Sequence, residues 1–135
     1  MSLLAGLAGA AAPGSVDAEL TGFRSAKGQV LACLTTRADR FPDCQKDPNA
    51  RRVTVATSAA HTLRFDGLPS GDYALALIHD ENSNGRLDTV MGIPREGFGF
   101  SRNPVIRFGP PKFSQASIAV TSGAVDENVR VKYLL

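Results

Sequence analysis

Residues 79–101 hold more side chains that could do chemistry or bind a ligand than any other stretch of the chain. Near the start of this segment, oxygen-bearing side chains recur at alternate positions around Gly85. Ca²⁺ prefers six to eight oxygen ligands, and a glycine at that place allows the sharp turn of a calcium loop. The spacing therefore predicts a candidate Ca²⁺ site at 80–88. Its expected ligands are Asp80, Asn82, Asn84, the carbonyl of Arg86, and Asp88.

The match to a helix-loop-helix calcium motif is incomplete. Its twelfth position should be a bidentate glutamate, and here it is Met91. The missing carboxylate would have to come from Glu81 or Glu96, and two aspartates with two asparagines predict a modest affinity. The alternative is a metal-free turn, because Asp and Asn side chains also bond their own backbone and Asn84-Gly85 favours a hairpin. The sequence leaves both interpretations open.

His79 precedes two carboxylates and suggests a second kind of chemistry. Paired with Asp80, Glu81 or Glu96, its imidazole could act as a general base in a hydrolase. The alternative is a hydrogen-bonded structural histidine at the end of a strand. Ser101 lacks the Gly-x-Ser-x-Gly context of a nucleophile elbow. We therefore assign no catalytic residue, and we expect a non-enzymatic protein rather than an enzyme.

Gly97-Phe98-Gly99-Phe100 places two aromatic rings on one side of a glycine-rich backbone. The two rings could line a ligand groove. Alternatively, they anchor a long loop over the end of the fold. The residues expected to form the ligand-binding or loop surface are His79, Glu81, Glu96, Phe98 and Phe100.

The rest of the chain predicts strands, because two-residue alternation recurs and helical periodicity is nearly absent. The strongest strand covers 72–80, where Ala74 and Ala76 would let another layer approach one face closely. About seven or eight strands are expected, at 17–23, 28–36, 52–56, 62–65, 72–80, 104–108, 115–121 and 125–134, with a long loop at 37–50. This pattern indicates an all-β fold, an antiparallel Greek-key β-sandwich of immunoglobulin or prealbumin type.

Residues 1–15 are expected to lie outside the fold, as a truncated signal-like segment or a flexible leader. Their small apolar composition, followed by Pro13-Gly14-Ser15, resembles the end of a secretory signal that lacks its basic region. The single β-sandwich domain is therefore expected at 16–135, in a periplasmic or secreted protein. No segment approaches the roughly 18 apolar residues of a transmembrane helix.

The chain has two cysteines, Cys33 and Cys44. In an exported domain an even count suggests a disulfide, worth about 2–3 kcal/mol for a loop of this size, whereas two buried thiols are the alternative. Basic and acidic residues number 15 and 13 and are interspersed, with no basic run longer than Arg51-Arg52. Nucleic-acid binding is therefore not expected.

Several stretches resemble a bacterial family known as domain of unknown function 2141. They are FDGLPSGDYA (65–74), HDENSNGRLD (79–88) and GIPREGFGFS (92–101), and 33–44 and 108–111 resemble one branch of that family. The resemblance spans roughly residues 17–135. It implies an exported protein and no particular activity. The Gly-Leu-Pro-x-Gly-x-Tyr motif from Gly67 also resembles the strand-turn-strand of transthyretin-like and carboxypeptidase-regulatory-like modules, which are mostly binding or accessory domains.

Three functional hypotheses follow. The first is an exported, non-enzymatic binding or accessory module that meets an unidentified protein or small molecule through the 79–101 loop, with Ca²⁺ as its candidate cofactor. The second is the hydrolase built on His79. The third is a structural or assembly role, in which a strand edge or the surface of Phe98 and Phe100 contacts a partner.

Overall fold

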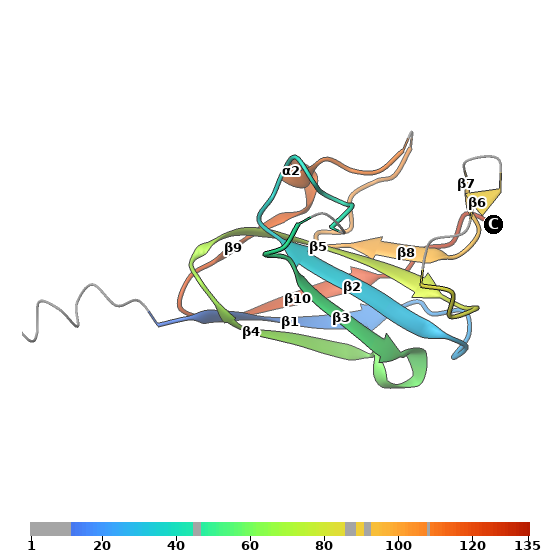
Figure 1. Cartoon of the computed structure of the whole chain (residues 1–135), viewed down its shortest axis with the longest axis horizontal. Coiled ribbons are helices and arrows are strands. Elements are labelled where there is room, and N and C mark those ends of the chain that lie inside the picture. The colour runs from blue at the N-terminus through green and yellow to red at the C-terminus, as the bar shows by residue number, and fades with distance from the viewer. Residues whose placement is uncertain (1–11, 45–46, 86–88, 91–92, 108) are drawn as a thin grey trace, which may run out of the picture.

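The computed structural model describes residues 12–44, 47–85, 89–90, 93–107 and 109–135, which form a two-layer β-sandwich (Figure 1). One sheet has the strand order β10 (Gly123–Arg130), β1 (Gly14–Thr21), β4 (Thr62–Leu68). The other has the order β3 (Arg51–Ala56), β2 (Gln29–Thr35), β5 (Gly71–Asp80), β8 (Gly97–Phe100), and β9 (Ser117–Val120) also pairs with β5. A small hairpin of β6 (Thr89–Val90) and β7 (Ile93–Pro94) lies between β5 and β8 in the chain.

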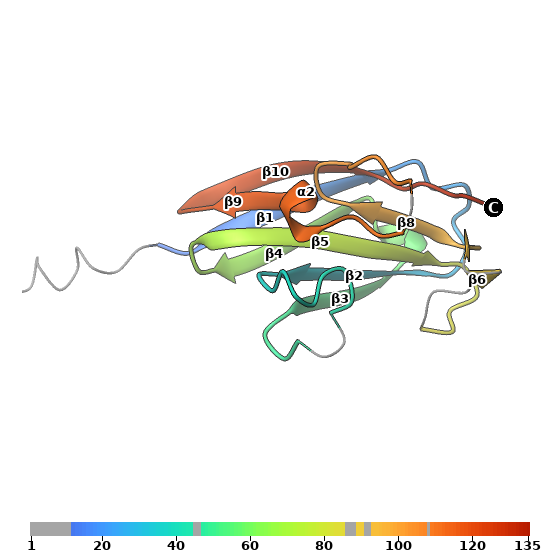
Figure 2. The same ribbon diagram turned by 90° about the horizontal axis from the view of Figure 1, so that it is seen from above.

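The eight strands of these two sheets, counted over the residues just given, confirm the predicted all-β sandwich. The chain crosses between the sheets from β1 to β2, β3 to β4, β4 to β5 and β9 to β10. One pairing corrects the antiparallel prediction, because β1 runs parallel to β10. The first and last strands therefore lie side by side in one sheet (Figure 2).

Some boundaries differ from the prediction. β1 begins at Gly14, so the end of the predicted leader belongs to the sheet, and Ser15 is buried. The predicted strand at 104–108 is irregular over 104–107, whereas residues 113–116 form a single helical turn, α2 (Phe113–Ala116). The described residues contain no helix that is long and apolar enough to cross a membrane.

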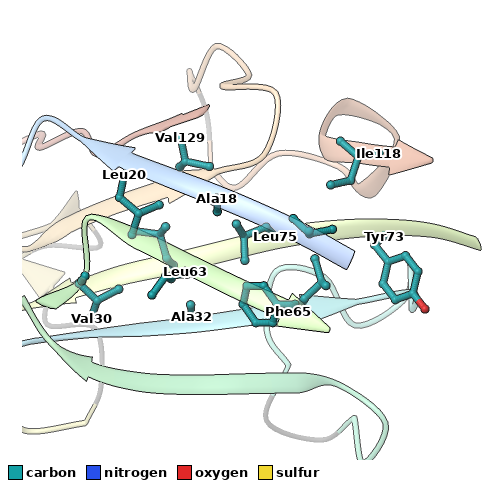
Figure 3. Packing of buried hydrophobic residues seen from close by; sticks show 14 of the residues in the cluster. Ala18, Leu20, Val30, Ala32, Leu63, Phe65, Tyr73, Leu75, Ile118 and Val129 are labelled. Atoms are coloured by element: carbon teal, nitrogen blue, oxygen red, sulfur yellow. The ribbon is translucent and has the colours of Figure 1, made fainter. Parts of the chain in front are cut away.

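The hydrophobic core lies between the two sheets, where alternate residues of each strand point inward (Figure 3). The three-stranded sheet contributes Val16, Ala18, Leu20, Leu63, Phe65 and Val129, and the five-stranded sheet contributes Val30, Ala32, Leu34, Tyr73, Leu75 and Leu77. The inward alternation of β5 continues one step beyond Leu77. It therefore directs the His79 side chain into the space between the sheets.

A second apolar cluster covers the opposite face of the five-stranded sheet. The sequence predicts that the small side chains of Ala74 and Ala76 let another layer approach this face closely, and aromatic rings form that layer. The ring centroids of Phe41 and Phe100 lie 5.9 Å apart in an edge-to-face arrangement, and those of Phe98 and Phe100 are also 5.9 Å apart. Phe98 and Phe100 are only 6% and 9% exposed, which corrects their predicted place on a loop surface. Both residues belong to strand β8, so the 79–101 segment is not one long loop.

Cys33 and Cys44 form a disulfide, with their Cα atoms 6.3 Å apart, that ties β2 to the 37–50 loop. The Thr35 hydroxyl donates to the buried carboxylate of Asp47 at 2.5 Å. The Arg52 guanidinium donates to the main-chain oxygens of Cys44 and Asp47. These contacts hold the loop over the second apolar cluster.

Ser101 bridges β8 and β9 along the edge of β5. Its fully buried Oγ accepts the N–H of Leu75 at 3.0 Å and donates to the carbonyl oxygen of Ala116. Its own N–H donates to the Leu75 carbonyl oxygen at 3.0 Å. The hydroxyl therefore replaces a neighbouring strand as the partner of Leu75, and it is not placed as a nucleophile.

We expect Ser101→Ala to lower the free energy of unfolding by about 2 kcal/mol, because it leaves a buried N–H and a carbonyl without partners. Urea denaturation measures the difference from the wild type. Ser58→Ala is the control, because Ser58 is exposed, and its effect should stay within about 0.5 kcal/mol. Equal stabilities of the two variants would contradict the bridging role of Ser101.

Candidate functional site

The polar residues that the sequence singles out gather at one end of the sandwich, where β5 ends. The β1–β2 connection, the β6–β7 hairpin and the C-terminal residues lie at the same end (Figure 1). His79 and Asp80 are the last two residues of β5, and both side chains are fully buried. We define the strand-end cluster as Arg24, His79, Asp80, Glu81, Glu96 and Tyr133.

The His79 ring is enclosed between the sheets. Its Nε2 lies 2.8 Å from the main-chain oxygen of Lys27, and its Nδ1 lies 2.7 Å from the hydroxyl of Tyr133. Because a carbonyl oxygen only accepts, Nε2 donates to Lys27, and the Tyr133 hydroxyl, which also accepts the N–H of Arg24, is the partner of Nδ1. Neither ring nitrogen has a carboxylate partner in these bonds. The geometry therefore does not support a histidine–carboxylate pair for acid–base chemistry.

The Asp80 carboxylate holds the turn that follows β5. Its Oδ1 accepts the N–H of Asn84 at 3.2 Å, and its Oδ2 accepts the N–H of Gly85 at 2.7 Å and the side-chain amide of Gln29 at 3.0 Å. Ser83 and Gly85 have positive φ angles of 56° and 80°, which reverse the chain direction within a few residues. The self-bonded Asx turn expected from the sequence is made by Asn82, whose Oδ1 accepts the N–H of Asn84 at 3.3 Å. Asp80 instead binds N–H groups four and five positions along the chain.

The same turn brings together the first oxygen donors of the predicted Ca²⁺ loop. The N–H of Asn84 lies 3.2 Å from Asp80 Oδ1 and 3.3 Å from Asn82 Oδ1, so these two oxygens are neighbours. Arg86 and Asp88, the remaining predicted ligands, lie outside the described residues. Within the part of the chain that the structure describes, no three His, Cys, Asp or Glu side chains are grouped as a metal site. The predicted loop relies instead on amide and carbonyl oxygens for much of its ligand set.

Arg24 joins the strand-end cluster to its surroundings. Its Nη2 and Nε lie 2.5 Å and 3.1 Å from Oε1 of Glu81, and its guanidinium stacks 4.4 Å above the ring centroid of Tyr133. It also donates to the main-chain oxygens of Arg95 and Leu135. One side chain therefore links the β1–β2 connection, the turn after β5, the segment before β8 and the C-terminal residues.

Glu96 completes the cluster from the other side of the hairpin. It is 5% exposed, and one of its carboxylate oxygens accepts the N–H of Glu81. The sequence singles out both glutamates, but it places them on a loop surface or as extra Ca²⁺ ligands. It does not identify Arg24 or Tyr133, because these residues lie 57 and 54 positions from their partners Glu81 and His79. Local spacing carries no signal for such contacts.

The hydrogen-bonded ion pair with Arg24 holds the pKa of Glu81 below its usual range, against the opposing effect of burial and with help from the Ser25 hydroxyl. The ion pair therefore stabilises the folded state fully when the pH lies above the unfolded-state pKa of Glu81, about 4.3. This stabilisation is lost as the pH falls through that value and then through the lower folded-state pKa.

We expect wild-type stability to fall more steeply than that of Glu81→Gln below about pH 5. Since the pair is partly exposed, the difference should stay under about 1 kcal/mol. Urea denaturation across this pH range measures it, and parallel pH profiles would contradict the effect.

A family model described as an uncharacterized protein conserved in bacteria (DUF2141) matches residues 18–128 of the chain. The match begins within β1 and ends within β10, so it includes strands of both sheets. The chain belongs to this family. The comparisons with curated proteins and with solved structures found no match.

Membership of DUF2141 confirms the resemblance that the sequence motifs indicate. The matched region includes every residue of the strand-end cluster except Tyr133, which follows its end. The family description names no activity. The function of this DUF2141 protein must therefore be argued from the chemistry of its own residues.

Proposed function

We propose that this DUF2141 protein is an exported, non-enzymatic binding or accessory module whose turn after β5 binds Ca²⁺. The ligands in this proposal are Asp80, Asn82, Asn84, the Arg86 carbonyl and Asp88. The observation that carries the proposal is the turn itself. Asp80 and Asn82 direct carboxylate and amide oxygens toward the same Asn84 N–H, in a segment whose backbone is already folded back on itself.

The chemistry of these donors suits a hard cation. Each carboxylate oxygen has two lone pairs. Oδ2 of Asp80 accepts the N–H of Gly85 and the side-chain amide of Gln29, so Oδ1, which accepts the N–H of Asn84, is the oxygen that this proposal assigns to the cation. Asn82 adds a neutral amide oxygen that Ca²⁺ accepts readily. Because the set contains only two carboxylates, we expect a dissociation constant of about 10⁻⁴–10⁻³ M, in the range of extracellular calcium modules.

A hydrolase is the less favoured alternative. General acid–base catalysis requires the imidazole to exchange a proton with a substrate or with water in a cleft. The His79 ring is fully buried, and its two nitrogens bond to Tyr133 and to the main chain of Lys27. The Ser101 hydroxyl is likewise buried and bonded to main-chain groups. These contacts favour structural roles for both side chains.

The disulfide supports the exported location in this proposal. Disulfides form and persist in oxidising compartments such as the periplasm and the extracellular space. In this protein, the Cys33–Cys44 bond ties a loop to the sheet beside the second apolar cluster. We therefore propose that the protein is periplasmic or secreted.

Calorimetric titration of chelator-treated protein with Ca²⁺ tests the proposed site. We expect saturable binding and a higher Tm in millimolar Ca²⁺, because a ligand that binds only the folded state stabilises it. Asp88→Asn should weaken binding at least about tenfold, because it removes one of two proposed carboxylate ligands. Asp72→Asn, an exposed position at the other end of β5, is the control and should bind as the wild type does. Absence of both heat and Tm shift in the wild type would reject the Ca²⁺ site.

A further inference from the structure

Two outer edges of the sandwich are covered by the chain itself. Along β8, the N–H and the carbonyl oxygen of Phe98 bond to the carbonyl oxygen and the N–H of Lys132. Along β10, the side-chain amide of Asn103 donates to the carbonyl oxygen of Asn128 and accepts the N–H of Arg130. Covering of this kind keeps a strand from pairing with another chain.

The hydrogen bonds of the five-stranded sheet fix the direction of the β3 peptide groups. Leu75 exchanges both of its main-chain bonds with Ser101, so odd-numbered residues of β5 face β8 and β9, and even-numbered residues face β2. The registers of β2 with β5 and with β3 then turn the peptide groups of Val53 and Val55 toward β2. The N–H of Thr57 donates to the carbonyl oxygen of Gly28 at 3.1 Å, in agreement with this parity.

The peptide groups of Arg52, Thr54 and Ala56 consequently face outward, along the open edge of β3. Within the described chain, the peptide groups of Thr54 and Ala56 have no hydrogen-bond partner along this edge, and both residues are exposed. β3 contains no proline, and its charged residues, Arg51 and Arg52, are confined to its first two positions, so the edge from Val53 to Ala56 has none of the charges or prolines that commonly protect such edges. The neighbouring edge of β4 differs, because Arg51 donates to the outward carbonyl oxygen of Asp66.

We propose that β3 is a dimerisation edge, which pairs antiparallel with β3 of a second copy of the chain about a two-fold axis at Thr54. Outward-facing residues must form the hydrogen-bonded pairs of such a ribbon. Thr54 therefore lies opposite Thr54 of the second copy, and Arg52 lies opposite Ala56. In this register no two like charges lie opposite each other, which an interface between two identical strands requires.

The inner face of the same ribbon explains why a second copy fits this edge. Val53 and Val55 are partly buried, and both pack against the core between the sheets. In the proposed register, Val53 of one copy lies opposite Val55 of the other, on the side of the sheet that faces the core. Cross-strand pairs of β-branched residues stabilise an antiparallel ribbon. The apolar cores of the two copies would then be continuous across the axis.

Sedimentation velocity of the wild type from about 5 μM to 1 mM tests the dimer. We expect weak, concentration-dependent association, because one strand pair forms a small interface. Thr54→Lys places two ammonium groups opposite each other and should raise the dimer dissociation constant at least about tenfold. Thr62→Lys is the matched control, since Thr62 is an exposed threonine on β4, and it should associate as the wild type does.

A mixture of Thr54→Lys and Thr54→Glu should regain association as a heterodimer, which also shows that both variants are folded. In the wild type, hydrogen exchange at the Thr54 amide should slow as the protein concentration rises. The proposal is overturned if the wild type stays monomeric throughout, if Thr54→Lys dimerises normally, or if exchange at Thr54 is independent of concentration. If the natural partner of the β3 edge is a strand of another protein, the wild type will stay monomeric, which is the first of these results.

Discussion

Asp80→Ala is expected to lower the free energy of unfolding by about 3–4 kcal/mol. The substitution leaves the N–H groups of Asn84 and Gly85 and the side-chain amide of Gln29 without their acceptor. Hydrogen bonds to a charged acceptor contribute about 1.5–3 kcal/mol each, but donors near the surface recover part of this from water. The turn after β5 should also loosen, with faster hydrogen exchange at Asn84 and Gly85.

Asp72→Ala provides the comparison for this effect, because Asp72 lies on the same strand and is exposed. Its effect on stability should stay within about 0.5 kcal/mol. Urea denaturation of both variants gives the two values on one scale. If Asp80→Ala unfolds at the same urea concentration as Asp72→Ala, the carboxylate does not organise the turn.

Gly28→Ala should lower the free energy of unfolding by more than about 3 kcal/mol, or prevent folding. Gly28 has a φ of +70°, and a Cβ atom there would lie 2.1 Å from the carbonyl oxygen of Asp80 and 2.7 Å from the backbone of Glu81. Neither neighbour is a flexible side chain, so the end of β5 would have to move. Such a shift adds the cost of overpacking to that of the left-handed backbone conformation.

Gly67→Ala separates these two contributions. Gly67 has a similar φ of +63°, but a Cβ atom there would meet nothing within 4 Å. Its expected cost is therefore only the conformational one, about 1–2 kcal/mol. Thermal or urea denaturation compares the two variants directly. Equal losses for Gly28→Ala and Gly67→Ala would show that close packing at the end of β5 does not restrict residue 28.

The sequence predicts most strands because one face of each is buried, which produces a visible alternation. The sequence of β8 does not show this alternation. Gly97 and Gly99 resemble loop residues, but a Cβ at Gly97 would lie 2.5 Å from the ring of Tyr133, and one at Gly99 would lie 2.8 Å from Val129. The glycines are therefore required by the close approach of β8 to β10 and to the residues that follow it. A composition that suggests flexibility here reflects tight packing.

The candidate site is predictable to a similar degree. The turn after Asp80 follows from local spacing, because Asp80 and Asn82 bond to backbone N–H groups only two to five positions along the chain. The burial of His79 follows from the alternation of β5, but its partners do not, since Tyr133 and Lys27 lie 54 and 52 residues away. The parallel pairing of β1 with β10 is equally long-range. Contacts of this kind depend on how the strands are ordered in the sheets, which no local pattern encodes.

The central proposal, that the Asp80 turn binds Ca²⁺ in a non-enzymatic module, is tested most directly by a ¹⁵N–¹H correlation NMR titration of the metal-free protein with CaCl₂. The amide signals of Asn84 and Gly85, whose N–H groups bond to the proposed ligand Asp80, should shift and reach saturation. The signals of Val129 and other core amides should stay in place. Unchanged signals for Asn84 and Gly85 up to about 10 mM Ca²⁺, well above the expected dissociation constant, would contradict the proposal.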